Sequence, residues 1–402
     1  MDGVGGEVNA MRAKLAFVIL YAVASNLFLI ADAQTPAAPP DFRSVVIRMG
    51  KAPGPIAIAD VNHDRKADII VGNMDDGTVT VLLGDGNGHF TSAPHSPFPC
   101  NASPNDIAVA DMNGDGHRDL IIANTQTPYI TVLLGDGKGG FKPSARSPFA
   151  TKSFPHPHGV VVGDFVGDGK PSVITDSWGH DQILLLTTDG KGNLILPGKF
   201  FSADLHTDSG VRAADFNHDG KLDIVTVNQA ANVVGLLLGD GRGDFRRAPG
   251  SPFAAGDTPW YFDVGDVNGD GNSDVAVIPY ERDIRDHKNL GVTILLGDGK
   301  GELTTMRGSP FSLQGCAGPA RVAIGNILGH RAGELRDVVV SCAQNNKLFF
   351  FTGTKSGAFA VTTRDMPTGW GGLALADLTG NGNDDVLISN NNAGTLTILF
   401  VK

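Results

Sequence analysis

A nine-residue pattern recurs along this chain and limits the folds that the chain can adopt. Its clearest copy is DMNGDGHRD at Asp111–Asp119, which lies between two short apolar runs. Related copies begin at Asp60, Asp215, Asp266 and Asp377. Each copy leads into a short run rich in apolar residues, which is typical of a buried strand. Five copies in this setting indicate one strand–loop–strand unit that repeats along the chain.

The loop has the donor pattern of a calcium site. Oxygen-bearing side chains recur at positions one, three, five and nine, and position seven would offer its backbone carbonyl. A hard cation such as Ca²⁺ takes about six to eight oxygens at ~2.3–2.6 Å, so alternate residues of a curled loop suit it. The alternative is that these side chains only cap tight turns. We expect up to five structural Ca²⁺ ions, held at Asp60, Asn62, Asp64, Lys66, Asp68, Asp111, Asn113, Asp115, His117, Asp119, Asp215, Asn217, Asp219, Lys221, Asp223, Asp266, Asn268, Asp270, Asn272, Asp274, Asp377, Thr379, Asn381, Asn383 and Asp385.

Composition narrows the class of protein. The 53 glycines and 23 prolines favour short strands and turns over helices. The net charge of -11 argues against a nucleic-acid partner. The sequence carries no nucleophile elbow, phosphate-binding loop or HExxH motif. These features favour an all-β protein without a recognisable catalytic motif.

The amino terminus is expected to be an export signal. Residues 1–33, or a shorter signal that starts at Met11, contain the apolar run Leu15–Ile30 and end in Ala31-Asp32-Ala33, a small-residue cleavage site. Residues 34–41 form a Pro-rich linker. The alternative is an uncleaved membrane anchor. We favour cleavage, which predicts a secreted, periplasmic or cell-surface protein with no membrane span.

The repeat continues to the end of the chain. Each unit holds four strand-like runs with the loop between the first two, so residues 42–402 are predicted to form an all-β, seven-bladed β-propeller with four antiparallel strands per blade. The seventh unit stops after its third strand, and Phe42–Ile47 precedes the first loop as a fourth strand would. We expect this amino-terminal strand to complete the last blade and close the ring. The first loop position or its equivalent recurs every 51–60 residues, at Asp60, Asp111, Asp164, Asp215, Asp266, Asn326 and Asp377.

The loops DxNxDGxxD, set between strands at this spacing, resemble the FG-GAP/VCBS repeat family and are similar to the integrin α-subunit propeller. The resemblance covers residues 42–402 and implies that the loop between the first two strands of a blade binds Ca²⁺ on one face of the disc. Two loops depart from the pattern. The third has Val166 and Ser172 in place of ligands, and the sixth, Asn326–Asp337, is three residues longer. We expect no tightly bound ion in either loop.

The face opposite the loops is the expected ligand face. Residues that build a blade recur from unit to unit, so ligand contacts should come from positions that differ between blades. The alternatives are solvated loop histidines and aromatic side chains that merely plug the channel. The candidate ligand residues are His156, His158, Trp178, His180, His206 and Trp260.

Three functions remain open, because a fold does not name a ligand. The leading interpretation is a monomeric, non-enzymatic recognition or adhesion module for a protein or glycan at the cell surface. The second is a secreted hydrolase or lyase that acts on polysaccharide or lipid headgroups, as some relatives in this repeat family do. The third is a purely structural extracellular protein.

The three cysteines divide into a pair and a single residue. Cys316 precedes the first strand of the sixth unit, and Cys342 ends its second strand, so both should lie on the same face. In an exported protein this arrangement predicts a disulfide. Cys100 has no obvious partner and is expected to stay free.

Overall fold

The computed structural model describes residues 40–402 apart from 152–155, 178–179, 208–209 and 281–289. The described residues belong to one compact unit, Pro39–Lys402. The predicted signal peptide and most of the linker lie outside them. Among the described residues, no helix is long and apolar enough to cross a membrane.

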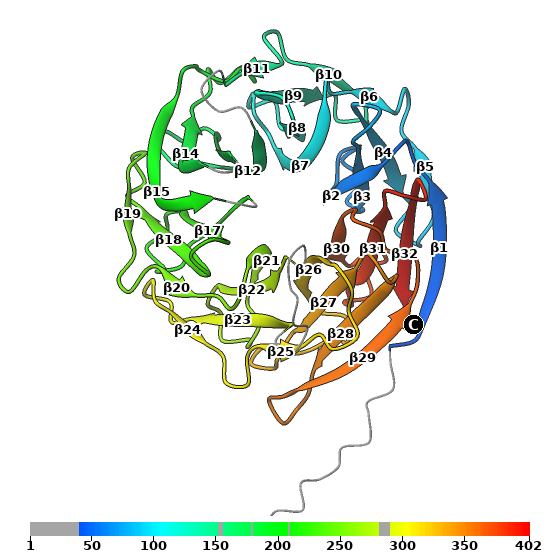
Figure 1. The fold of residues 1–402 in the computed structure, drawn as a ribbon. Helices are drawn as coiled ribbons and strands as arrows, with labels where there is room; N and C mark the ends of the chain where they lie inside the picture. The colour runs from blue at the N-terminus through cyan, green and yellow to red at the C-terminus, as the bar shows by residue number, and fades with distance from the viewer. Residues whose placement is uncertain (1–39, 152–155, 178–179, 208–209, 281–289) are drawn as a thin grey trace, which may run out of the picture. The chain divides into compact units, whose positions relative to one another are not determined.

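Seven antiparallel sheets follow one another around a ring (Figure 1). The innermost strands are β2 (Pro53–Ala59), β7 (Ser103–Ala110), β12 (Pro157–Gly163), β16 (Val211–Ala214), β21 (Pro259–Gly265), β26 (Pro319–Gly325) and β30 (Leu373–Ala376). The second strands are β3 (Asp68–Asn73), β8 (Asp119–Thr125), β13 (Ser172–Ser177), β17 (Asp223–Asn228), β22 (Asp274–Pro279), β27 (Asp337–Cys342) and β31 (Asp385–Asn390). The chain is therefore the predicted seven-bladed propeller.

The outer half of each blade completes the four-stranded sheet. The third strands are β4 (Thr78–Gly84), β9 (Tyr129–Gly135), β14 (His180–Leu186), β18 (Val233–Gly239), β23 (Gly291–Gly297), β28 (Lys347–Gly353) and β32 (Thr395–Val401). The fourth strands are β5 (Phe90–Ser92), β10 (Phe141–Pro143), β15 (Lys199–Thr207), β19 (Phe245–Arg247), β24 (Leu303–Thr305), β29 (Phe359–Asp365) and β1 (Phe42–Arg48).

The hydrophobic core lies between neighbouring blades. The second strands are covered on both faces, and β3 is buried along its whole length, which explains its unbroken run of Ile and Val. Ile70 and Val81 of the first blade share one cluster with Leu120 and Ile122 of the second. Each blade therefore depends on its neighbours to bury its faces.

The amino-terminal strand closes the ring, as the sequence predicts. Strand β1 pairs with β32 over its whole length, from Phe42 opposite Val401 to Arg48 opposite Thr395. The first and last blades also share a core in which Ile69 packs with Ile398. The last blade is thus built from both ends of the described chain (Figure 1).

A short Ser-Pro-Phe motif stands where the outer strand of four blades is interrupted. Their three-residue fourth strands are followed by two-residue strands, namely β6 (Phe98–Pro99), β11 (Phe149–Ala150), β20 (Phe253–Ala254) and β25 (Phe311–Ser312). In the gap of the second blade, the hydroxyl of Ser147 accepts a hydrogen bond from the backbone N–H of Val132 at 3.0 Å. Ser96, Ser251 and Ser309 occupy the same position. The serine therefore replaces a missing hydrogen bond of the strand ladder.

The structure joins Cys316 and Cys342 by a disulfide, as the sequence predicts, with their Cα atoms 5.5 Å apart. The bridge ties the segment before β26 to the end of β27 within the sixth blade. Cys100 is buried and free.

Candidate functional site

The predicted calcium loops each connect the first and second strands of a blade. In the second blade, the carboxylate of Asp111 accepts the backbone N–H groups of Gly114 and Gly116 at 2.7 and 2.8 Å. The amide of Asn113 donates to Asp115 at 2.9 Å. Both glycines have positive φ, 76° and 85°, which explains glycine at positions four and six of the pattern.

The aspartate at position nine holds the blade together. Asp119 is fully buried, and its two carboxylate oxygens accept the N–H groups of Met112 and Gly135 at 2.8 Å. It thereby joins the end of the first strand to the end of the third. Burial raises the pKa of Asp119 to about 6, although these two N–H groups act to lower it. Asp68, Asp223, Asp274 and Asp385 make equivalent bonds. A carboxylate oxygen has two lone pairs, so these bonds leave acceptor capacity for a cation.

The donor types suit calcium, although the calcium sites stay a prediction. In the described part of the chain, no three His, Cys, Asp or Glu side chains converge as a metal-binding group. Each loop instead offers carboxylate oxygens together with Asn or Thr oxygens and backbone carbonyls, the oxygen mixture that Ca²⁺ accepts. The residues at positions one, three, five and seven are therefore chemically able to hold the ion.

The two departing loops keep part of the hydrogen bonding of the others, and in the sixth Asp337 still accepts the N–H groups of Ile327 and Gly353. In the third blade, Asp164 accepts the N–H groups of Gly167 and Gly169 as its counterparts do, and Ser172 takes over one bond of the position-nine aspartate. In the sixth, the imidazole of His330 lies 2.7 Å from Asp337. The curl of the third loop therefore forms without the full set of predicted ligands.

The structure places the predicted ligand residues unevenly. His158 lies on β12 beside the central cavity, and its carbonyl accepts the amide of Asn105 at 2.8 Å. His156 is half-buried immediately before β12. Trp260 stacks on Tyr280, with ring centres 4.5 Å apart. Trp178 lies outside the described residues. His180 and His206 are on β14 and β15, where the backbone of His180 pairs with Thr207, the neighbour of His206, and their side chains are not described.

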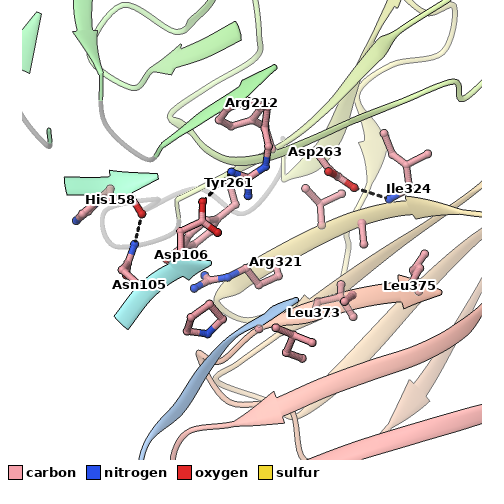
Figure 2. A pocket seen from close by; sticks show the side chains of 17 residues that line it. Asn105, Asp106, His158, Arg212, Tyr261, Asp263, Arg321, Ile324, Leu373 and Leu375 are labelled. Atoms are coloured by element: carbon pink, nitrogen blue, oxygen red, sulfur yellow. Dashed lines mark hydrogen bonds and ion pairs between the residues drawn. The ribbon is translucent and has the colours of Figure 1, made fainter. Parts of the chain in front are cut away.

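A central cavity of about 290 Å³ is lined by residues on or beside all seven innermost strands. Its charged side chains come from four of these strands, with Asp106 on β7, Arg212 on β16, Asp263 on β21 and Arg321 on β26 (Figure 2). Apolar residues of β2, β26 and β30 form much of the remaining wall. The cavity therefore combines charge with an apolar lining.

Three of these charges neutralise one another in part. A guanidinium nitrogen of Arg212 lies 3.2 Å from Asp106. Burial opposes the charge on Arg212, but the carboxylates of Asp106 and Asp263 outweigh it and raise the pKa of the guanidinium. Burial also raises the pKa of Asp263, whose carboxylate accepts the N–H of Ile324 at 2.9 Å.

Arg321 is held in a different way. Its guanidinium carbon lies 3.9 Å from the centre of the Tyr261 ring, in the range of a cation–π contact. One of its N–H groups donates to the carbonyl of Ala320 at 2.7 Å. Stacking therefore orients Arg321 within the cavity.

Asp106, Arg212, Asp263 and Arg321 were missed by reasoning from the sequence. The candidate ligand residues named from the sequence include none of them, and these four lie three or five positions before a loop. A signal was available for three of them, because Arg212, Asp263 and Arg321 each place a charge inside an otherwise apolar first strand. To predict that the four side chains converge, one must know how the blades are arranged around the ring.

The comparisons with known proteins agree with this architecture. The FG-GAP-like repeat pattern matches residues 60–122, 111–175 and 215–277, and no curated protein matches the chain in sequence.

Several solved structures have a similar fold. The crystal structure of BBS1N in complex with ARL6DN is 12% identical with a TM-score of 0.59, and the match covers 90% of this chain and 96% of that one. A lectin from Agrocybe aegerita that recognises non-reducing terminal N-acetylglucosamine is 15% identical with a TM-score of 0.52, covering 91% and 87%. A putative 6-phosphogluconolactonase from Bacteroides fragilis is 20% identical with a TM-score of 0.55, covering 78% and 85%. Likeness at these identities concerns the fold alone. The chain is thus a seven-bladed β-propeller that contains FG-GAP-like repeats in three places.

Proposed function

We propose that this chain is a non-enzymatic recognition module that binds a glycan at its central cavity, on a propeller that calcium stabilises. The observation that carries the proposal is the convergence of Asp106, Arg212, Asp263 and Arg321 on one cavity. The blades otherwise repeat, and repetition alone would not require charges at these positions.

The size of the cavity favours a sugar over the surface of a folded protein. Its volume of about 290 Å³ is close to the lower end of the roughly 300–1,000 Å³ typical of ligand pockets. Carboxylates and guanidinium groups can hydrogen-bond hydroxyls. The Agrocybe aegerita lectin supports the capacity of a similar fold to present a sugar site.

A glycan array tests this proposal. Labelled protein should bind a subset of glycans, and Asp106→Asn should weaken that binding by about tenfold or more, because it removes the charge while keeping the shape. Asp365→Asn is the matched control, since Asp365 is exposed on the outer strand β29. An array without bound glycans, or binding that Asp106→Asn leaves unchanged, would show the proposal to be wrong.

The calcium part of the proposal has its own test. Ca²⁺ bound only to the folded state would stabilise it by ~2.7 kcal/mol per site at a hundredfold excess over the dissociation constant. The melting temperature should therefore be higher in millimolar Ca²⁺ than in EDTA, and Asp115→Ala should reduce the difference.

Asp168→Ala supplies the matched control for calcium. Asp168 and Asp115 both accept the N–H two residues later, but the loop of Asp168 lacks two predicted ligands. This variant should leave the calcium effect unchanged. Equal melting temperatures of the unmodified protein in EDTA and Ca²⁺ would rule out structural calcium.

We also propose that the protein is exported and meets its glycan at a cell surface, as a monomer. The expected signal peptide supports export, and the disulfide between Cys316 and Cys342 suits an oxidising compartment. Detection of the chain outside the cytosol, cleaved after residue 33, is the expected result.

A further inference from the structure

We infer that the glycan carries an acidic group, a carboxylate or a sulfate ester, and that Arg321 binds this group. The inference rests on the proposed function and specifies its ligand. It begins from the difference between the two arginines that line the cavity.

Arg212 already has its counter-charges. It lies 3.2 Å from Asp106, and Asp263 is close enough to raise its pKa further. Two carboxylates and one guanidinium leave this group of three side chains with a net negative charge. An anionic ligand group would therefore be repelled from Asp106 and Asp263.

Most N–H donors of the Arg321 guanidinium remain available for a ligand. Among the described residues, no carboxylate lies within ion-pair distance of its guanidinium, which contacts the Tyr261 ring and the carbonyl of Ala320. A guanidinium has five N–H donors, so most of them remain for a ligand. Its planar fork matches the paired oxygens of a carboxylate or sulfate.

Packing alone does not explain an arginine at this position. The equivalent residues, five positions before the loop, are Pro55 in the first blade and Gly159, Gly210 and Gly372 in three others. Pro55 and Gly159 lie within β2 and β12, so an innermost strand forms without a long side chain at this position. The Tyr261 ring holds the guanidinium flat, which reduces the entropy lost when a ligand binds.

The charged groups of the cavity together indicate the chemistry of the ligand. Its acid group would meet Arg321, and its hydroxyls would meet Asp106 and Asp263, which line the same cavity (Figure 2). A volume of about 290 Å³ suits one terminal sugar unit. Uronic acids and sulfated sugars have this combination of groups.

Isothermal titration with matched sugars tests the inference. Glucuronic acid and glucose 6-sulfate are compared with glucose, and galacturonic acid with galactose. We expect at least one acidic sugar to bind tenfold or more tightly than its neutral counterpart. Arg321→Gln should abolish this preference, and Arg321→Lys should keep part of it, because a lysine retains the charge without the fork.

Arg43→Gln is the matched control, since Arg43 also lies over an aromatic ring, that of Phe400 at 4.2 Å, but on the outer strand β1. It should keep the acid preference. Acidic sugars that bind no more tightly than their neutral counterparts, or an acid preference that survives Arg321→Gln, would overturn the inference and leave the proposed function standing. Sodium sulfate that binds as tightly as glucose 6-sulfate would overturn the assignment to a sugar. Failure of every sugar, together with an empty glycan array, would overturn both.

Discussion

Asp176 is an ionisable residue that lies in a fully buried position, where a negative charge is unfavourable. It is fully buried on β13, where one carboxylate oxygen accepts the N–H of Gly159 at 2.6 Å. Within the described part of the chain, the other oxygen has no hydrogen-bond partner. Burial raises the pKa of Asp176 to about 7, and the nearby charge of Asp106 adds to the effect. Ser389 holds the equivalent position in the seventh blade and satisfies the carbonyl of Gly54 with a hydroxyl at 2.6 Å.

We predict that Asp176→Asn makes the protein less sensitive to alkaline pH. The folded-state pKa lies above the ordinary value of 3.8, so the folded state binds the proton more tightly than the unfolded state does. The stability that the protonated acid contributes is therefore lost as pH rises from about 4 through about 7, by up to roughly 1.4 kcal/mol per pH unit. An asparagine keeps the neutral shape at every pH.

Urea unfolding at pH 5, 6, 7 and 8 measures this effect. The stability of Asp176→Asn relative to the unmodified protein should rise with pH. Asp181→Asn, an exposed position five residues later, should show no such trend. A constant difference for Asp176→Asn across these pH values would contradict the prediction.

At the scale of a strand, short side chains complete the hydrogen bonds that the blade leaves open. The position-nine aspartates connect first and third strands, as Asp119 does through Met112 and Gly135. Where the fourth strand is interrupted, the serine of the Ser-Pro-Phe motif accepts a hydrogen bond from the third strand, as Ser147 does from Val132. A buried N–H without a partner is unfavourable, so these residues recur wherever the same gap recurs.

We predict that Ser147→Ala lowers the free energy of unfolding by roughly 1–3 kcal/mol, because it leaves the N–H of Val132 without its partner. Val132 is fully buried, so water cannot easily replace the hydroxyl. Ser44→Ala, on an exposed part of β1, is the control and should be nearly neutral. Equal urea midpoints for the two variants would argue against the assigned role of Ser147.

For the whole molecule, closure of the ring depends on the first described strand. Strand β1 covers the edge of β32 over seven residue pairs, and Phe42 packs against Phe350 of the sixth blade, with ring centres 5.4 Å apart. Removal of β1 would leave β32 as an exposed edge with unpaired N–H and C=O groups. The same strand therefore provides both closure and protection against edge-to-edge pairing.

We predict that deletion of Phe42–Met49 lowers the melting temperature and produces aggregates in size-exclusion chromatography. The physical reason is the exposed edge of β32, which can pair with another chain. Val46→Ala is the control, because Val46 is 62% exposed and its replacement keeps the backbone of β1. A truncated protein that stays monomeric with an unchanged melting temperature would show that another contact closes the ring.

The sequence by itself determined the architecture of this protein. The loops that begin at Asp60, Asp111, Asp215, Asp266 and Asp377 mark the blades at nearly equal spacing, and each blade solves the same packing problem. A repeat with a regular period of this kind can be recognised from the sequence alone. The same holds for the closing strand at Phe42, since the last unit lacks a fourth strand of its own.

Only the tertiary structure decided which polar side chains meet in the cavity. Asp106, Arg212, Asp263 and Arg321 lie on four blades, at two different positions of the repeat, and each looks like an isolated exception in the sequence. The ring brings them together because all innermost strands face one axis. Likewise, the structure placed Trp260 against Tyr280 and gave the position-nine aspartates backbone partners. The convergence of the four cavity residues depends on contacts between different blades, which no local pattern records.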